Sequence, residues 1–273
     1  MSKTRIFFIG GGNMAEAIFA RICPNKYQIN VIQRNKAKCD NLIQLYPHIT
    51  FCTALDEQLS DSDILILAVK PIDAKNAILA IQDKITFPII ISVMAGITTN
   101  ILKVWSLNNK IIRIMPNTPS SVGEGLSGIY FNENITDYEQ QQIKAIFISI
   151  GKIFICQNEE MIDKITAVAG SAPAYFFYFL ESMIDVAINQ FGLSKEDAQA
   201  ITLQVAKGSI KLIENNQNLT IAKLRTNVTS KNGTTERAIN VFEQYDLKQI
   251  VHKAEVACYN RAKEISQSFN ETL

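Results

Sequence analysis

The 273-residue chain has two histidines, His48 and His252, and five scattered cysteines. No two cysteines form a C-x-x-C pair, and the cysteines and histidines lack the spacing of a zinc site. We therefore expect no metal centre and interpret the cysteines as buried or surface thiols. So few histidines also leave no basis for a histidine-dependent nucleophilic triad. Any chemistry is thus expected to belong to a cofactor.

Charge and hydropathy argue against two further classes of protein. The 27 basic and 26 acidic side chains leave a formal charge of +1, so there is no broad basic field for nucleic acid or an anionic membrane. Apolar runs such as residues 89–93 are far shorter than the roughly 20 residues of a membrane span. The run after Arg5 ends in three glycines and not in a signal-peptide cleavage site. We expect a cytoplasmic protein without nucleic-acid or membrane partners.

The first fifteen residues combine a strand, a glycine turn and a helix. Residues 5–9 are apolar and favour a β-strand, and a helical spacing of apolar residues begins at Ala15. In this context the glycines predict a dinucleotide-binding fingerprint, with one glycine for the tight turn and another for close approach to a pyrophosphate. The alternative is an ordinary glycine turn. The predicted cofactor-binding residues are Gly10, Gly11, Gly12, Asn13, Met14 and Ala15.

The second predicted strand, residues 28–33, ends in basic and amide residues. NAD-preferring sites tend to place an acidic residue here for the ribose hydroxyls, whereas this chain has Arg34 and no carboxylate until Asp40. A guanidinium can bind the additional phosphate of NADP, which a carboxylate would repel. The alternative is a solvated basic turn. The pattern favours NADPH as the cofactor and leaves NADH possible.

Three later apolar runs, residues 63–69, 89–93 and 110–115, are typical of buried parallel strands. Ligands of open α/β sheets bind at the carboxyl ends of such strands. The residues that follow these strands should therefore line one cofactor cleft. Those predicted to bind the cofactor are Ala68, Val69, Lys70, Pro71, Ala95, Gly96 and Asn117.

Beyond about residue 158 the chain has helix signals and no convincing strand. At roughly 100–200 residues per domain, we predict a dinucleotide-binding domain over residues 1–157 and a smaller all-α domain over residues 158–273. The fold class is thus α/β of Rossmann type with a helical C-terminal domain. Residues 174–180 are apolar on every side of their helix, which indicates burial. A dimer core or a large intramolecular interface would provide this burial.

A polar loop, residues 227–237, precedes another helical segment that extends to about residue 268. Hydroxyls and backbone amides gathered before a helix N-terminus suit a carboxylate. The alternative is plain helix capping by Thr234 or Thr235.

Several motifs together resemble the pyrroline-5-carboxylate reductase family over residues 6–265. The glycine turn is shared by many dehydrogenases, whereas two later segments are specific in their order and spacing. The motifs are Ile-Gly-Gly-Gly-Asn-Met-Ala (9–15), Leu-Ala-Val-Lys-Pro (67–71), Met-Pro-Asn-Thr-Pro (115–119), Val-Gly-Glu-Gly (122–125), Ala-Val-Ala-Gly-Ser-Ala-Pro-Ala-Tyr (167–175) and Val-Thr-Ser-Lys-Asn-Gly-Thr-Thr (228–235).

The resemblance implies reduction of 1-pyrroline-5-carboxylate to L-proline by hydride transfer from NAD(P)H, in a homodimer that some members extend to a ring of dimers. A substrate that arrives as an iminium needs no catalytic acid, so the residues would position and stabilise. Thr235 is the candidate for contact with the ring nitrogen, and Lys70 for orienting cofactor or loop. The substrate-binding residues implied are Ser230, Asn232, Gly233, Thr234 and Thr235.

Two departures from the family pattern leave other functions open. Ala172 stands where the family has glycine, and Lys231-Asn232-Gly233 replaces Pro-Gly-Gly. Asn tolerates left-handed backbone better than most residues, so the turn can survive. The alternatives are a reductase of another cyclic imine or a keto acid, and a dinucleotide-binding regulator without activity.

Overall fold

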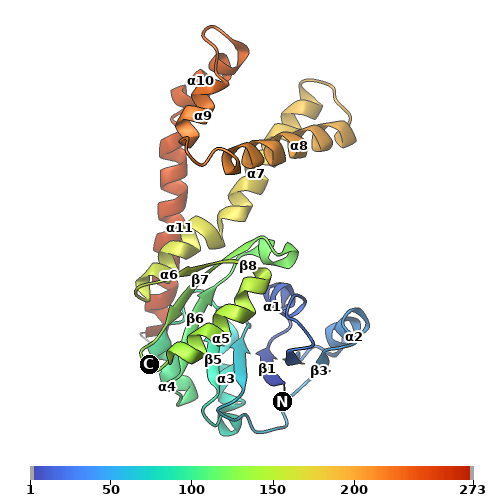
Figure 1. The fold of residues 1–273 in the computed structure, drawn as a ribbon, viewed down its shortest axis with the longest axis vertical. Coiled ribbons are helices and arrows are strands. Elements are labelled where there is room, and N and C mark those ends of the chain that lie inside the picture. The colour runs from blue at the N-terminus through green and yellow to red at the C-terminus, as the bar shows by residue number, and fades with distance from the viewer. Residues whose placement is uncertain (1–2, 271–273) are drawn as a thin grey trace. The chain divides into compact units, whose positions relative to one another are not determined.

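The computed structural model describes residues 3–270, in which the N-terminal part forms an eight-stranded sheet (Figure 1). The strand order is β3-β2-β1-β4-β5-β6-β7-β8. Strands β1 to β6 are parallel, β7 is antiparallel to β6, and β8 is parallel to β7. The 3-2-1-4-5-6 order confirms the predicted Rossmann arrangement. The strands are β1 (Thr4–Ile9), β2 (Tyr27–Ile32), β3 (Thr50–Cys52), β4 (Ile64–Leu67), β5 (Ile89–Ser92), β6 (Ile111–Met115), β7 (Gly125–Phe131) and β8 (Gly151–Ile155).

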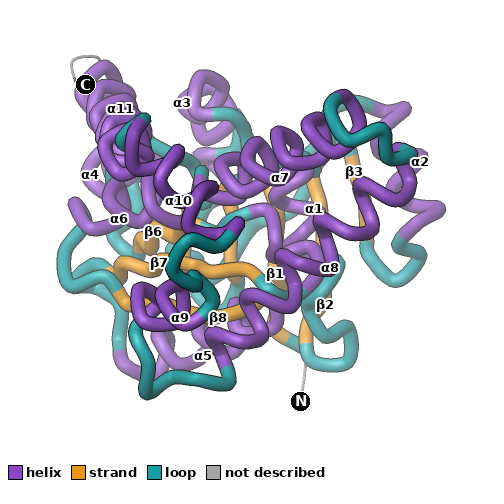
Figure 2. The backbone as a smooth tube through the Cα atoms, turned by 90° about the horizontal axis from the view of Figure 1, so that it is seen from above, coloured by secondary structure: helices purple, strands orange, loops and turns teal. Residues whose placement is uncertain are grey.

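The helices lie between the strands in the first part of the chain and follow one another in the second. Among the described residues from 160 onward there are helices and connecting segments but no strand (Figure 2), as predicted. The helices are α1 (Asn13–Phe19), α2 (Lys36–Leu45), α3 (Ala74–Leu79), α4 (Thr99–Ser106), α5 (Asp137–Phe147), α6 (Glu160–Ile165), α7 (Ala172–Asn189), α8 (Lys195–Glu214), α9 (Ile221–Asn227), α10 (Thr234–Gln244) and α11 (Leu247–Asn270).

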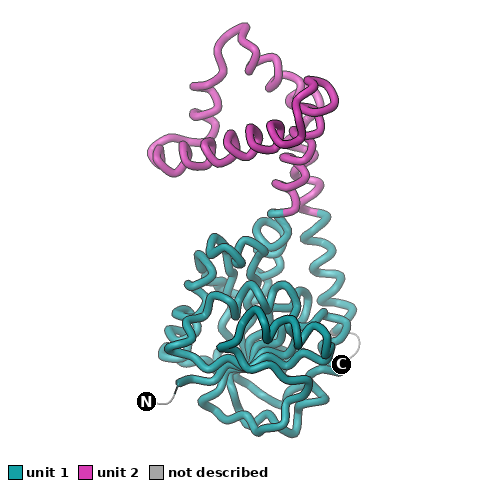
Figure 3. The backbone as a smooth tube through the Cα atoms, turned by 90° about the vertical axis from the view of Figure 1, so that its right-hand side faces the viewer, with its two compact units in different colours: residues 1–173, 257–273 teal, residues 174–256 magenta. Residues whose placement is uncertain are grey.

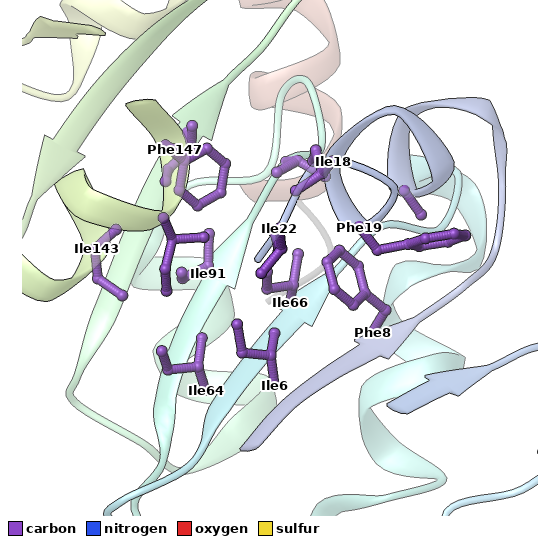
Figure 4. Close-up of a cluster of buried hydrophobic side chains, with 14 of the residues drawn as sticks. Ile6, Phe8, Ile18, Phe19, Ile22, Ile64, Ile66, Ile91, Ile143 and Phe147 are labelled. Carbon is purple, nitrogen blue, oxygen red and sulfur yellow. The ribbon is translucent and has the colours of Figure 1, made fainter. Parts of the chain in front are cut away.

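Alternate residues of each strand pack on opposite faces of the sheet. On one face, Ile6 and Phe8 of β1 pack in a cluster with Ile18 of α1 and Phe147 of α5 (Figure 4). On the other, Phe7 belongs to a second cluster that includes residues of α3 and α4. Helices therefore cover both faces, which explains why the central strands are continuously apolar.

The chain divides into two compact units (Figure 3). One comprises residues 1–173 with 257–273 and contains the sheet, and the other comprises residues 174–256. The domain boundary at residues 157/158 stays a prediction.

Short-range sequence patterns mark the helix ends in the second unit. Gly192 has a φ of +69°, and its backbone N–H donates to the Ile188 carbonyl at 3.2 Å, as a glycine beyond a helix end does. At the start of α8, Ser194 Oγ accepts from the Asp197 backbone N–H at 3.0 Å. These short-range patterns fix where α7 ends and α8 begins.

Asp63, immediately before β4, is a buried carboxylate with several hydrogen-bond partners. It accepts from Arg5 Nε at 2.8 Å, from Arg5 Nη2 at 2.6 Å and from the Ser60 backbone N–H at 2.7 Å. Burial alone would raise the pKa of this carboxyl, but the bonds from Arg5 and Ser60 outweigh it and hold the pKa below its ordinary value. The pair ties the start of β4 to β1.

We expect Asp63→Asn to lower the free energy of unfolding by about 2 kcal/mol at pH 7, because it removes charge-assisted hydrogen bonds. A carboxyl whose pKa is lowered by folding stabilises the protein above its unfolded pKa of about 4, and this stabilisation disappears as the pH falls through the folded pKa. Urea unfolding of both proteins between about pH 7 and pH 3 measures the difference, which should shrink in acid. A difference independent of pH would mean that the charge of Asp63 is not responsible.

Two further sequence expectations concern thiols and membranes. All five cysteines are free thiols, with Cys39 and Cys156 buried, as predicted. No helix within residues 3–270 is long and apolar enough to cross a membrane.

Candidate functional site

The glycine turn after β1 is shaped by close contact with the neighbouring strands. The Gly10 backbone N–H donates to the Ile32 carbonyl of β2 at 2.9 Å. Gly10 has a φ of +100°, and a Cβ there would lie 2.8 Å from the Ala68 carbonyl oxygen, so a side chain would be both strained and obstructed. A Cβ at Gly12 would meet no atom within 4 Å. The backbone at Gly12 thus borders open space, where a ligand can approach it.

That open space is part of a cavity of about 570 Å³ at the carboxyl ends of β1, β2 and β4. This is the edge at which open α/β sheets bind nucleotides. The structure brings together seven of the residues that the sequence assigned to cofactor binding. These lining residues are Gly10, Gly11, Gly12, Arg34, Ala68, Val69 and Lys70.

Arg34 and Lys70 are the two predicted cations at this cavity. Arg34 follows β2, and Lys70 precedes the 3₁₀ turn Pro71–Asp73; both are exposed. Within residues 3–270, the Arg34 guanidinium forms no ion pair. Its charge is therefore available to an anionic ligand. The other basic lining residue, Lys84, donates from Nζ to the Leu55 carbonyl oxygen.

The segment around α3 provides a wall of the cavity that was not predicted from the sequence. Asp73, Asn76, Ala77 and Ala80 line it, at spacings of three, four and seven residues. Such spacing places side chains on one face of a helix. The helical spacing of these residues was visible in the sequence after Pro71. Which face of the helix lies toward the ligand depends on how the helix packs on the sheet, and no sequence pattern showed this.

The remaining predicted cofactor residues lie on the same edge but do not line this cavity. Asn13, Met14 and Ala15 are the first residues of α1, Pro71 opens the 3₁₀ turn, and Ala95 and Gly96 follow β5. Their roles stay predictions.

The side-chain amide of Asn117, which follows β6, is used within the chain. Its Nδ2 donates to the Ala169 carbonyl at 3.1 Å, and its Oδ1 accepts from the Leu126 backbone N–H at 2.9 Å. The bond to Ala169 ties the segment after β6 to a π-helical turn, Thr166–Gly170, that precedes α7, and the bond from Leu126 ties it to β7. A role of Asn117 in cofactor binding also stays a prediction.

The predicted carboxylate loop lies in the second unit. Asn232 has a φ of +58°, so it adopts the left-handed conformation that was expected of it in place of glycine. Its backbone N–H donates to Glu236 Oε2 at 2.7 Å, and the Gly233 N–H donates to the Ser230 carbonyl at 3.0 Å. A Cβ at Gly233 would lie 2.3 Å from Ser230 Oγ, so a larger residue there would require the Ser230 side chain to move. The tight turn is therefore preserved despite the different residues.

The turn leads into α10 without a side-chain cap. Gly233 is the N-cap residue, and Thr234 and Thr235 are the first two helical residues. The alternative that either threonine caps this helix is wrong, since no side-chain cap hydrogen bond is present. Both threonines are exposed, and their hydroxyls form no hydrogen bond among residues 3–270. They are free to bind a ligand.

Ala172, the other departure from the family pattern, is the first residue of α7 and does not have a positive φ. Its backbone therefore does not require glycine.

Helix α7 exposes large apolar side chains. Phe176, Phe177 and Tyr178 are 64%, 63% and 73% exposed, and no residue of α7 is buried in the described chain. Within residues 3–270, no intramolecular interface buries this helix. Its exposed apolar side chains therefore indicate a surface that binds a partner.

Comparison with known proteins identifies both parts of the chain. Residues 159–265 match a family model for pyrroline-5-carboxylate reductase dimerisation, and residues 5–96 match a model described as NADP oxidoreductase, coenzyme F420-dependent. A pyrroline-5-carboxylate reductase of Pasteurella multocida is 36% identical, over 98% of this chain and 100% of the relative.

Two solved structures are similar along nearly the whole chain. A pyrroline-5-carboxylate reductase from Coxiella burnetii is 34% identical with a TM-score of 0.81, covering 97% of this chain and 99% of that one. A Plasmodium falciparum pyrroline carboxylate reductase with NADP bound is 26% identical with a TM-score of 0.85, covering 97% and 100%.

Proposed function

The chain belongs to the pyrroline-5-carboxylate reductase family, and we propose that it reduces 1-pyrroline-5-carboxylate to L-proline, the last step of proline biosynthesis, with NADPH as reductant. The observation that carries this proposal is the end-to-end match to reductases of that name, which includes both the glycine turn and the 230–235 loop. The fold alone would not be evidence for a particular substrate.

The cavity fits the adenosine half of a dinucleotide. The turn at Gly10 to Gly12 borders open space at the edge of the sheet where a pyrophosphate binds in this fold. Arg34 has a guanidinium, without an ion pair within residues 3–270, for the 2′-phosphate of NADPH. When bound, the reduced nicotinamide supplies the hydride.

The substrate carboxylate is assigned to the loop at Ser230, Asn232, Gly233 and Thr234. Backbone amides at the start of α10 favour an anion. Thr235, with an exposed hydroxyl in the first turn of α10, is assigned to the ring nitrogen, directly or through a water. Lys70 orients cofactor or loop. Because a protonated cyclic imine already accepts hydride, these residues position the substrate and stabilise charge.

The assembly is a homo-oligomer built by the helical region. Residues 159–265 match the dimerisation model, and α7 offers an exposed aromatic surface. We assign the homodimer interface to this surface. A ring of dimers and a cytoplasmic location stay predictions from the sequence.

The test is oxidation of NADPH, followed by its absorbance, on addition of 1-pyrroline-5-carboxylate to the purified protein, with NADH in parallel. We expect turnover with formation of proline and a preference for NADPH. A six-membered cyclic imine carboxylate and a 2-keto acid serve as comparison substrates. Faster turnover of either would replace the proposed substrate. NADPH binding without turnover of any substrate would indicate a regulator.

A further inference from the structure

The segment after β5, residues 93–98, is anchored by a glutamate that is distant in sequence. Glu159 Oε1 accepts from the Thr99 backbone N–H at 2.7 Å, and Glu159 Oε2 accepts from Thr99 Oγ1 at 2.8 Å. Thr99 is the first residue of α4, whose own N-cap, Thr98, bonds the Ile101 N–H at 3.3 Å. A carboxylate at a helix N-terminus is favourable, and both of its oxygens here hold one residue.

Arg113 of β6 fixes the position of that glutamate. The Arg113 side chain is 1% exposed, with Nη1 3.1 Å from Glu159 Oε1 and Nη2 3.4 Å from Asp163 Oδ1. Burial raises the pKa of the Asp163 carboxyl, and Arg113 acts against that rise. Because the guanidinium lies on a central strand, Glu159 has a rigid support.

The same segment is confined on another side by α11. Gly96 has a φ of +75°, and a Cβ there would lie 2.2 Å from Ile265 Cγ2. The segment is thus held at Thr99 by Glu159 and at Gly96 by close packing. Contacts at Gly96 and Thr99 therefore restrain the C-terminal half of the segment.

We propose that Glu159, supported by Arg113, is a positioning residue that holds residues 93–98 in the place where they meet the nicotinamide half of the cofactor. The inference rests on the proposed function, because that half lies beyond β4, at the carboxyl ends of β5 and β6, when the adenosine half occupies the cavity described above. Glu159 acts through the backbone of this segment and touches neither cofactor nor substrate.

This role differs from that of a stabilising ion pair. The Glu159 side chain is 24% exposed, but its partner Arg113 is 1% exposed, so removal of Glu159 leaves a buried guanidinium with one ion-pair partner fewer and also destabilises the protein. Glu159 also accepts two hydrogen bonds from Thr99, the residue that directly follows the segment 93–98. Loss of Glu159 should therefore change the segment as well as the stability of the whole protein, and Thr99→Val, which keeps the ion pair, separates the two effects.

The experiment compares Glu159→Ala with Glu160→Ala in the full-length protein. Glu160 is the adjacent residue and is exposed; its Oε1 accepts a hydrogen bond from the Tyr259 hydroxyl at 2.9 Å and forms an ion pair with Lys164 Nζ at 3.7 Å. Its replacement removes a negative charge from the same helix without changing a contact of Thr99. Hydrogen exchange in the cofactor-free protein, followed for the peptide covering residues 94–101, is the first readout. The second is the affinity for NADPH and for adenosine 2′,5′-bisphosphate, which lacks the nicotinamide. The third readout is the kcat and KM for 1-pyrroline-5-carboxylate, measured separately.

For Glu159→Ala we expect exchange of this peptide to accelerate about 10-fold, kcat to fall about 10-fold, and the affinity for adenosine 2′,5′-bisphosphate to stay within about twofold. Glu160→Ala should change none of these. Equal effects in the two variants, or unchanged exchange in Glu159→Ala, would overturn the proposal.

Thr99→Val keeps the Arg113 pairing and removes one hydrogen bond, so it provides the test if Glu159→Ala does not fold. We expect the same changes in exchange and kcat, smaller in size, and unchanged values would count against the proposal. If the unmodified protein does not turn over 1-pyrroline-5-carboxylate, the proposed function fails. The exchange and affinity readouts still decide the role of Glu159.

Discussion

Replacing Thr235 with alanine is expected to lower kcat about 100-fold, the usual loss when one hydrogen-bond donor to a reacting centre is removed. The same change should alter the free energy of unfolding by less than about 0.5 kcal/mol. The structure supports this separation of effects. Thr235 is exposed, and its hydroxyl has no partner among residues 3–270, so alanine removes no described intramolecular hydrogen bond.

Two matched variants isolate the hydroxyl of Thr235. Thr235→Ser retains the hydroxyl and should keep most of the activity. Thr234→Ala removes the neighbouring hydroxyl, which we assign to the carboxylate, and should raise KM for the imine more than it lowers kcat. Steady-state kinetics of the three variants, with melting temperatures, provide the measurements. A normally folded Thr235→Ala protein with unchanged kinetics would remove Thr235 from the mechanism.

The cofactor half of the fold was predictable because its signals are local. Continuous apolar runs predicted the central strands, and residues 89–93 and 110–115 correspond to β5 and β6 within one or two residues. Parallel strands place their carboxyl ends on one edge. The turn at Gly10 and the end of β4 therefore had to meet, and both line the cavity.

Other features depend on contacts that no local pattern encodes. The π-helical turn Thr166–Gly170 is stabilised by the bond of Asn117 to Ala169, across 52 residues. The long final helical segment is in fact two helices, interrupted at Asp246, whose φ is +49°. Glu159 had no visible role until the sheet brought it to Thr99.

The substrate loop lies between these two cases. Asn232 could be assigned a left-handed conformation because few residue types tolerate one, and its φ of +58° agrees. Capping by Thr234 or Thr235 was an equally reasonable prediction from composition. It fails because Gly233 occupies the N-cap position, so that both threonines lie inside the first turn of the helix.

The second large effect is expected at Arg34, where alanine should weaken NADPH binding about 20-fold and leave NADH binding within about twofold. The two cofactors differ by the 2′-phosphate, so a selective loss identifies the guanidinium as its partner. Arg34 is exposed, and screening by salt should therefore reduce the difference. Fluorescence titration of both cofactors at low and high ionic strength measures each quantity.

Lys36→Ala is the matched control for Arg34→Ala. Lys36 is an exposed cation two residues further along, at the start of α2, and it does not line the cavity. If general positive charge attracted NADPH, both variants would weaken binding to a similar degree and with a similar dependence on salt. If Arg34 instead supported the adenine or the turn, NADPH and NADH would lose affinity equally. A loss of affinity for NADPH but not NADH, in Arg34→Ala but not in Lys36→Ala, would show direct contact between Arg34 and the phosphate. General attraction by charge would not distinguish the two residues, and support of the adenine or the turn would not distinguish the two cofactors.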